Sequence, residues 1–358
     1  MKLLFYAGGF APVGGVEAFI RDLSDALAAE GHAVSLLCWG PDSALVAADA
    51  RGLEVRRQNF RWGCRLYAPD LLLAIRQGLR QTRCHDLVLF TKIPPLPILW
   101  MLRNLSGPTR PLFVYVTPYR PREMWQARDL GWMLNMIDAI IVQAAPFVED
   151  LRACGFRGIV EIIPYIPPAP VTAIDLPACD GALRLGFLGR LVPQKNLHYL
   201  LQVFSRLGTD PCSDPRPWEL HLFGDGSERA ELERLADELG LRDRTFFHGG
   251  IPREAVPSAI DRCHLFAFSS VSEGQCLAAL EILSRGRPVV ATPVGAFPEI
   301  LAAPELGAIA PLDDADRFAR ILGELGTRLA NGRLTPRATQ SRFTRLLCRD
   351  AVVQRYCT

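Results

Sequence analysis

The chain has 358 residues, of which 49% are hydrophobic and 22% charged, and its formal net charge is +2. This balance is typical of a folded protein and gives no reason to expect nucleic acid as a partner. The length exceeds what one hydrophobic core usually holds, so we expect two domains. The ten cysteines form no CxxC pair, which favours a reduced cytoplasmic protein over a disulfide framework or zinc site. No run of about 18 apolar residues predicts a membrane-spanning helix.

Short apolar runs alternate with amphipathic helical patterns along the whole chain, which is the signature of parallel βαβ units. In the first half, strands are predicted over residues 3–7, 33–37, 87–90, 112–116 and 139–142, and helices over 16–28, 70–81, 124–137 and 146–154. In the second half, strands are predicted over 183–188, 219–223, 245–247, 265–268 and 289–291, and helices over 197–207, 228–239, 253–263 and 277–285. The fold class is therefore α/β with two Rossmann-like domains.

A proline-rich segment separates the two halves. Residues 164–170 read Pro-Tyr-Ile-Pro-Pro-Ala-Pro, and this proline density forbids a regular helix or a central strand. We therefore expect an N-terminal domain over 1–164, a linker over 165–181, a C-terminal domain over 182–340 and a final helical segment over 341–358.

Each half opens with a strand followed by glycines. Gly14 and Gly15 begin the first helix, where backbone amides attract anions, although such a turn is common in α/β domains. In the second half, residues 189–196 follow the first strand and contain Arg190 and Lys195. Two cations at the carboxyl edge of a parallel sheet suit a diphosphate, and two ordinary surface cations explain the spacing equally well.

Two glutamates stand out further along. Glu273 follows the strand at 265–268, and Glu281 lies on the apolar helix after it, where a carboxylate is costly without a partner. Glu281 can accept hydrogen bonds from a ribose diol, and Glu273 can do so from a sugar ring. A helix-dipole carboxylate and a solvent-exposed glutamate are the alternatives.

Taken together, these segments resemble the retaining glycosyltransferases of family 4, whose hallmark is Glu-x7-Glu. The resemblance rests on Gly-Gly-Val-Glu at 14–17, Gly-Arg-x4-Lys-Asn at 189–196, Leu-Phe-Gly-Asp-Gly-x-Glu-Arg at 222–229, Phe-x-Gly at 247–249, Glu-x7-Glu at 273–281, Pro-Val-Val-Ala-Thr at 288–292 and Pro-Glu-Ile at 298–300. It implies a GT-B fold, in which two Rossmann-like domains face each other across a cleft and a C-terminal helix crosses back to the first domain.

The resemblance also implies roles for individual residues. Arg190, Lys195 and Glu273 form the catalytic set, with the two cations on the donor diphosphate and Glu273 on the transferred sugar. The implied donor-binding residues are Gly14, Gly15, Arg190, Lys195, Gly224, Gly249, Glu273, Gly274, Gln275, Cys276, Leu277 and Glu281. No metal and no cofactor are implied, because the cations take the place of a metal ion and the nucleotide sugar is a substrate. Retention is expected through front-face attack, with the leaving phosphate as base.

Several positions depart from the family pattern. Gln275 and Cys276 stand where the family has an aromatic residue and a glycine, and Thr117 stands where a histidine often follows the strand. The phosphate and ribose contacts are kept, whereas sugar recognition is altered. A catalytically degenerate sugar-nucleotide-binding protein and a GT-B epimerase are therefore the alternatives to a transferase.

The acceptor is expected on the first domain, and Thr117, Tyr119 and Arg120 are its candidate contacts. The apolar stretch 93–102, the aromatic and basic stretch 119–125 and the arginines of 51–85 could hold a lipid-linked saccharide at an anionic membrane. Ordinary packing and a solvated face explain them equally well. We expect a cytoplasmic transferase, which could lie at the inner membrane face, that takes a UDP- or GDP-sugar donor and a saccharide or lipid-linked saccharide acceptor.

Overall fold

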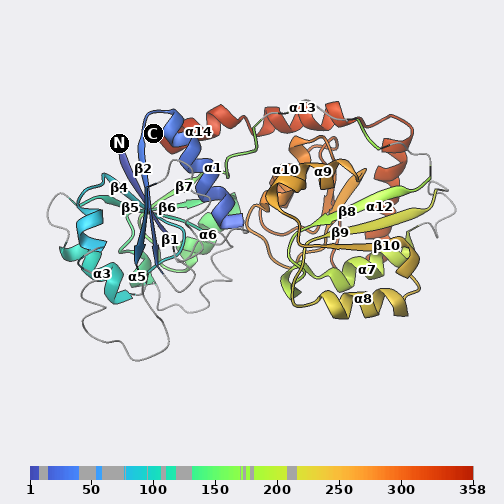
Figure 1. The fold of residues 1–358 in the computed structure, drawn as a ribbon, viewed down its shortest axis with the longest axis horizontal. Coiled ribbons are helices and arrows are strands. Elements are labelled where there is room, and N and C mark those ends of the chain that lie inside the picture. The colour runs from blue at the N-terminus through green and yellow to red at the C-terminus, as the bar shows by residue number, and fades with distance from the viewer. Residues whose placement is uncertain are drawn as a thin grey trace. The chain divides into compact units, whose positions relative to one another are not determined.

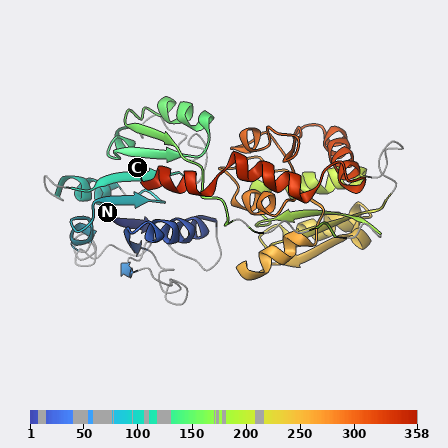
Figure 2. The same cartoon turned by 90° about the horizontal axis from the view of Figure 1, so that it is seen from above.

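The computed structural model describes residues 1–7, 15–39, 54–58, 76, 78–94, 96–105, 110–117, 131–169, 171, 175–177, 181–207 and 216–357. The chain divides into two compact units (Figures 1 and 2). One consists of Met1–Ile166 with Asp350–Thr358, and the other of Pro167–Arg349. Each unit is described below by itself.

The first unit is built on a parallel sheet in the order β3-β2-β1-β4-β5-β6-β7. Its strands are β1 (Lys2–Ala7), β2 (Ala33–Trp39), β3 (Glu54–Gln58), β4 (Leu87–Phe90), β5 (Leu112–Val116), β6 (Ala139–Val142) and β7 (Ile159–Ile162). Its helices are α1 (Gly15–Ala29), α3 (Leu96–Leu105), α5 (Gly131–Leu134), α6 (Ala145–Ala153) and α14 (Arg349–Cys357). After its first residue β1 is entirely buried, as expected for a parallel strand with both faces covered.

The second unit contains a parallel sheet in the order β10-β9-β8-β11-β12-β13. Its strands are β8 (Leu183–Leu188), β9 (Trp218–Phe223), β10 (Thr245–Gly249), β11 (Leu265–Phe268), β12 (Val289–Ala291) and β13 (Gly307–Ile309). Its α-helices are α7 (Leu197–Arg206), α8 (Arg229–Glu238), α9 (Val256–Asp261), α10 (Leu277–Ser284), α11 (Phe297–Ile300), α12 (Ala315–Ala330) and α13 (Pro336–Leu346). Figure 1 shows α7 and α8 on one face of this sheet and α9 and α10 on the other.

Every strand predicted from the sequence is present, and β3, β7 and β13 are additional. β3 reads Glu-Val-Arg-Arg-Gln and has too many charges for an apolar run, while β13 has only three residues, Gly-Ala-Ile. The predicted helix 253–263 is shorter in the structure, a 3-10 turn followed by α9, which carries Pro257 in its first turn. Of the predicted helix 124–137, the described part contains only α5, and residues 135–138 turn into β6.

The C-terminal segment is two helices rather than the single returning helix expected over 341–358. α13 belongs to the second unit, and only α14 belongs to the first. There α14 lies beside α1, where the rings of Tyr356 and Phe19 are 6.2 Å apart and Gln354 donates to Glu30 at 3.1 Å. The end of the C-terminal unit therefore lies at Arg349 rather than at residue 340.

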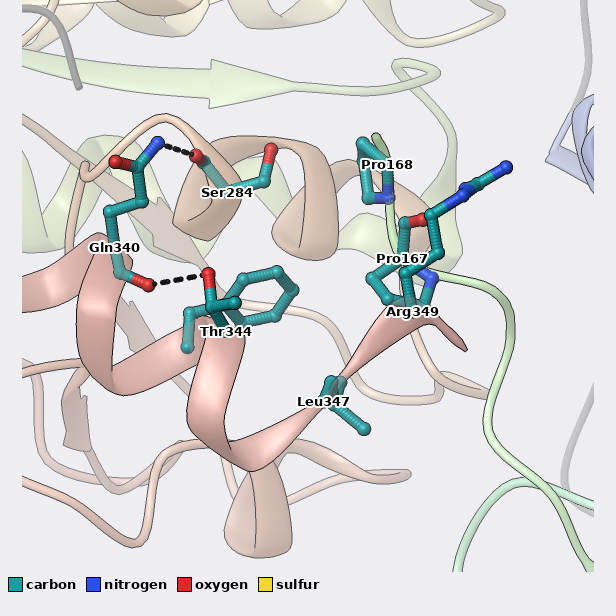
Figure 3. Close-up of a pocket in the computed structure, with 8 residues that line it drawn as sticks. Pro167, Pro168, Ser284, Gln340, Thr344, Leu347 and Arg349 are labelled. Atoms are coloured by element: carbon teal, nitrogen blue, oxygen red, sulfur yellow. Dashed lines mark hydrogen bonds between the residues drawn. The ribbon is translucent and has the colours of Figure 1, made fainter. Parts of the chain in front are cut away.

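A small pocket marks where α13, α10 and the linker meet (Figure 3). The Gln340 side-chain amide donates to the carbonyl of Ser284 at 2.7 Å and to that of Val171 at 2.8 Å. The guanidinium of Arg349 donates to the carbonyl of Pro167 at 2.5 Å. α13 therefore fixes the linker against α10, the helix that carries Glu281.

Candidate functional site

The second sheet changes direction between β8 and β11. From β8 the strands extend first through β9 to β10, and then on the other side through β11 to β13, so β8 and β11 are neighbours. In open α/β sheets, ligands bind outside the carboxyl ends of the strands at such a point. The loops that follow these two strands are residues 189–196 and 269–276, which contain the cations and Glu273 predicted from the sequence.

Lys195 and Glu273 form a buried ion pair at this edge. The Lys195 Nζ lies 2.5 Å from Glu273 Oε1, and their side chains are only 14% and 6% exposed. The Ser270 hydroxyl donates to the same Oε1 at 2.7 Å. Burial lowers the pKa of the Lys195 ammonium, but the Glu273 carboxylate beside it acts in the opposite direction, and the pKa lies above its usual value, so Lys195 is a cation at neutral pH.

Hydrogen bonds to backbone carbonyls hold the two loops together. The Gln194 side chain donates to Ser272 O at 2.9 Å, and the Val271 amide donates to Gln194 O at 3.0 Å. The Ser269 hydroxyl lies 2.9 Å from the carbonyl oxygens of both Lys195 and Asn196 and can donate to either. These contacts fix the backbone around Lys195 relative to that around Glu273.

A third loop packs against them through Gly224. Its φ of +143° and its contact with Gly189 both require glycine, because a Cβ here would lie 1.8 Å from Gly189 O. The Gly224 amide donates to Gly249 O at 2.8 Å, so these two predicted donor-binding glycines are direct neighbours. The strand ends of β8, β9 and β10 thus present bare backbone next to one another.

The residues between Glu273 and α10 form a tight, buried turn. Gly274 O accepts from the Ala296 amide at 2.9 Å, and Gln275 is 2% exposed. Cys276 precedes α10, which starts at Leu277, and has φ 56° and ψ 83°, in the left-handed region. Burial raises the pKa of the Cys276 thiol to about 12, so the thiol is neutral.

Arg190 and Glu281 complete the predicted set in this unit. Arg190 is exposed and forms no ion pair with any residue that the structure describes. It lies close enough to Lys195 to oppose the protonation of that ammonium, so a bound anion would relieve the repulsion between the two cations. Glu281 is half-buried on α10. Its negative charge contributes to the raised pKa of the Cys276 thiol.

Of the predicted residues of the first unit, Gly15 and Thr117 lie within the described part of the chain. Gly15 is the first residue of α1, whereas Gly14, Tyr119 and Arg120 lie outside the described residues. Thr117 follows β5 and is fully buried, with its carbonyl 3.5 Å from the Tyr165 hydroxyl. The structure therefore places Thr117 beneath the surface of the sheet edge.

Sequence reasoning missed Ser269, Ser270 and Thr292. All three are fully buried, and the Thr292 hydroxyl donates to Ser270 O at 2.6 Å. Their signal is present in the sequence, since Ser269 and Ser270 are the two residues after the buried strand β11 and Thr292 is the residue after the buried strand β12. Among the described residues, no group of three or more His, Cys, Asp or Glu side chains is arranged to hold a metal ion.

Two family models match the chain. The Glycosyltransferase Family 4 model matches residues 13–165, and the Glycosyl transferases group 1 model matches residues 177–326. These matches correspond closely to the two units, and together they cover most of the chain. The chain belongs to the family 4 glycosyltransferases.

Curated relatives and solved structures agree with this assignment. A 2-deoxystreptamine glucosyltransferase of Streptomyces kanamyceticus is 30% identical over 159 residues, which is 42% of this chain and 39% of the relative. One subunit of the human phosphatidylinositol N-acetylglucosaminyltransferase is 24% identical over 310 residues, 81% of this chain and 61% of the relative. The chain thus spans less than two thirds of the length of these relatives.

The structural similarity extends over the full chain. The Anabaena HepE structure in complex with UDP has a TM-score of 0.76 at 18% identity and covers 100% of this chain and 98% of its own. The apo lipopolysaccharide outer core galactosyltransferase WaaB has a TM-score of 0.74 at 18% identity, with 100% of both chains covered. At this level of identity the comparison establishes the fold, which is GT-B with two Rossmann-like units.

Proposed function

We propose that the chain is a retaining, metal-independent glycosyltransferase that moves a sugar from a UDP- or GDP-sugar to a saccharide or lipid-linked saccharide. The observation that carries this proposal is the pairing of Lys195 with Glu273 where β8 and β11 end, with the exposed cation Arg190 on the same loop as Lys195. Family membership and the names of the relatives support it.

In this proposal Arg190 and Lys195 bind the donor diphosphate. A guanidinium matches the planar geometry of phosphate oxygens, and the Lys195 ammonium adds a second positive charge. As the bond to the sugar breaks, charge develops on the leaving phosphate, and these cations stabilise it without a metal ion. An excess of EDTA should therefore leave the transfer rate unchanged.

The sugar and the ribose would be bound on the β11 side. Glu281 on α10 accepts hydrogen bonds from the ribose hydroxyls, and Glu273 accepts them from the transferred sugar. The backbone of Gly274 to Leu277, which includes Gln275 and Cys276, orients that sugar. Gly224 and Gly249 let the nucleoside approach the backbone, and Gly14 and Gly15 act on the phosphates from the first unit.

Retention follows if the acceptor hydroxyl attacks the anomeric carbon from the face that the diphosphate leaves. The bond from that carbon to the acceptor oxygen forms as the bond to the phosphate oxygen breaks. The acceptor proton passes to the leaving phosphate oxygen, so no protein nucleophile is required.

Several relatives suggest the donor and the acceptor class. HepE was solved with UDP and with UDP-glucose, which supports a UDP-sugar donor. LpsE of Rhizobium meliloti, 28% identical over 203 residues, is named a lipopolysaccharide core biosynthesis glycosyltransferase, which supports a saccharide acceptor and a role in polysaccharide biosynthesis.

Thermal shift with UDP, GDP and their sugar conjugates tests the donor site, and Arg190→Ala tests its chemistry. Loss of one or two charged hydrogen bonds, about 1.5–3 kcal/mol each, should weaken nucleotide binding at least tenfold. Arg234→Ala, which removes the same charge from an exposed position on α8, should leave the affinity unchanged. Equal affinity in wild type and Arg190→Ala would refute the diphosphate assignment, and binding without any turnover would favour the non-catalytic alternative.

The acceptor would bind to the first unit, whose surface also suits an anionic membrane. Trp100 of α3 and Trp132 of α5 are 50% and 56% exposed, and Arg103 of α3 donates to the carbonyl of Met136 just after α5. The arginines Arg76, Arg80 and Arg83 are exposed in the same unit. No described helix is long and apolar enough to cross a bilayer.

Liposome flotation tests the membrane contact. The protein should float with vesicles containing anionic lipid, and Trp100→Ala together with Trp132→Ala should reduce the bound fraction. Protein that stays in the soluble fraction with anionic vesicles would rule the contact out.

A further inference from the structure

Among the described residues, only one oxygen of the Glu273 carboxylate accepts hydrogen bonds. Oε1 accepts both the Lys195 ammonium at 2.5 Å and the Ser270 hydroxyl at 2.7 Å. Oε2 accepts no hydrogen bond from any residue that the structure describes. The same carboxylate is therefore fixed from one side and has a second oxygen to offer to a ligand.

The groups behind Glu273 restrict its movement. Ser270 is fully buried, and its carbonyl in turn accepts the Thr292 hydroxyl at 2.6 Å. The backbone on either side of Glu273 is also held, by Gln194 at Ser272 O and by Ala296 at Gly274 O. Glu273 is thus presented by β11, β12 and their loops as a fixed anion.

Lys195 is the movable partner in this pair. Its backbone is anchored through Ser269, but its side chain is long, and its ammonium can donate three hydrogen bonds, of which the structure shows one, to Glu273. A diphosphate approaching Arg190 and Lys195 therefore meets an ammonium whose positive charge Glu273 already neutralises, and the two anions compete for that charge.

We infer that Glu273 is a competing counter-ion for Lys195, so that donor binding transfers Lys195 from Glu273 to the diphosphate and frees the carboxylate for the sugar hydroxyls. This inference rests on the proposed function and adds to it. Glu273 opposes binding of the nucleotide part and favours binding of the sugar part, which discriminates the intact donor from a bare nucleoside diphosphate.

The test is the affinity for UDP and GDP of the full chain with Glu273→Gln, measured by calorimetry. Glutamine keeps the size of the side chain and an oxygen that accepts from Ser270, but it removes the charge that holds Lys195. The affinity for the nucleoside diphosphate should rise about tenfold, as expected for release of one charged hydrogen bond. The melting temperature without ligand should fall, because Lys195 loses its counter-ion.

Two variants make the result specific. Asp225→Asn removes the same charge from the β9 loop, where Asp225 contacts Arg229 and its own loop but not Lys195, and it should leave the affinity unchanged. Glu273→Asp keeps the charge on a shorter side chain that cannot keep the 2.5 Å contact, so it should give a smaller gain and serves if Glu273→Gln does not fold.

The outcomes separate this inference from the proposed function. Binding to the wild type with no gain in either Glu273 variant, or with an equal gain in Asp225→Asn, would overturn the competition while the donor site stands. Binding of UDP and GDP to neither the wild type nor the variants would overturn both.

Discussion

Cys276 has a backbone conformation that ordinarily belongs to glycine. Its φ of 56° is one of two positive values among the described non-glycine residues, and the other is φ 50° at Asn196. Both residues directly precede helices, α10 and α7, that follow the two strands of the candidate site. The departure from the family glycine at 276 therefore places strain beside Glu273, where the turn is tightest.

The strain at Cys276 can be measured by two substitutions. Cys276→Ala keeps the left-handed strain without the thiol, whereas Cys276→Gly removes the strain as well. We expect the glycine variant to be the more stable of the two by about 1 kcal/mol in urea unfolding, the reverse of the usual order of alanine and glycine. An alanine variant as stable as the glycine variant would show that the turn relaxes around a side chain.

At the scale of elements, the site depends on loops whose backbones touch. Gly295, in the turn between β12 and α11, has φ +60°, and a Cβ there would lie 2.3 Å from Gly274 O. Gly240, after α8, has a similar φ of +67° with open space around it. Alanine at Gly240 therefore tests the cost of the left-handed backbone alone, whereas alanine at Gly295 adds the cost of the steric clash.

Gly240→Ala should lower the free energy of unfolding by about 1 kcal/mol, from backbone strain alone. Gly295→Ala should lower it by more than about 2 kcal/mol and should weaken donor binding, because the clash displaces the backbone next to Glu273. Denaturant unfolding and nucleotide titration of both variants measure this difference. Similar losses of unfolding free energy in Gly240→Ala and Gly295→Ala would show that the backbone around Glu273 adjusts to the added methyl group.

The amino ends of β8 and β11 are joined by a titratable side chain. The Arg184 amide donates to His264 Nδ1 at 2.9 Å, and the His264 amide donates back to Arg184 O at 2.9 Å. Burial, with Arg184 nearby, lowers the pKa of His264 to about 4. The unfolded chain, with a histidine pKa near 6.5, therefore binds this proton first as the pH falls.

His264 should thus contribute stability that is complete above pH ~6.5 and lost as the pH falls towards about 4. His264→Asn keeps an acceptor but does not titrate, so its unfolding free energy should depend less on pH across this window. His221 and His248, whose pKa values are also lowered, titrate equally in both proteins and cancel in the comparison. Parallel pH profiles for wild type and variant would contradict this role.

For the whole molecule, we expect a bound nucleotide to change hydrogen exchange in one of the two units only. All the proposed phosphate, ribose and sugar contacts except Gly14 and Gly15 belong to Pro167–Arg349. In hydrogen exchange on the full chain, UDP or GDP should protect the amides of residues 189–196 and 269–281, because a bound ligand stabilises the native state around it. Protection confined to Met1–Ile166 would contradict the prediction, because it would mean that the nucleotide binds to the first unit and not to Pro167–Arg349.

Much of the fold was predictable from the sequence because parallel strands buried on both faces read as continuous apolar runs. Such runs identify β1, β8 and β11 directly, and a proline-rich segment indicates the division near Ile166. A second rule, that ligands bind at the carboxyl ends of parallel strands, predicts Arg190, Lys195 and Glu273 as ligand-binding residues from the sequence. β3, β7 and β13 were not predicted, because a charged edge strand, an edge strand interrupted by Glu161 and a three-residue strand lack that signal.

Only the tertiary structure decided which groups meet. The ion pair of Lys195 with Glu273 joins residues 78 positions apart, and Ser270 and Thr292 support it from two strands. The break between α13 and α14, the strain at Cys276 and the burial of Thr117 also depend on packing between distant segments. Sequence periodicity reports how each element faces the core, whereas contacts across strand ends arise only when the sheet brings its loops together.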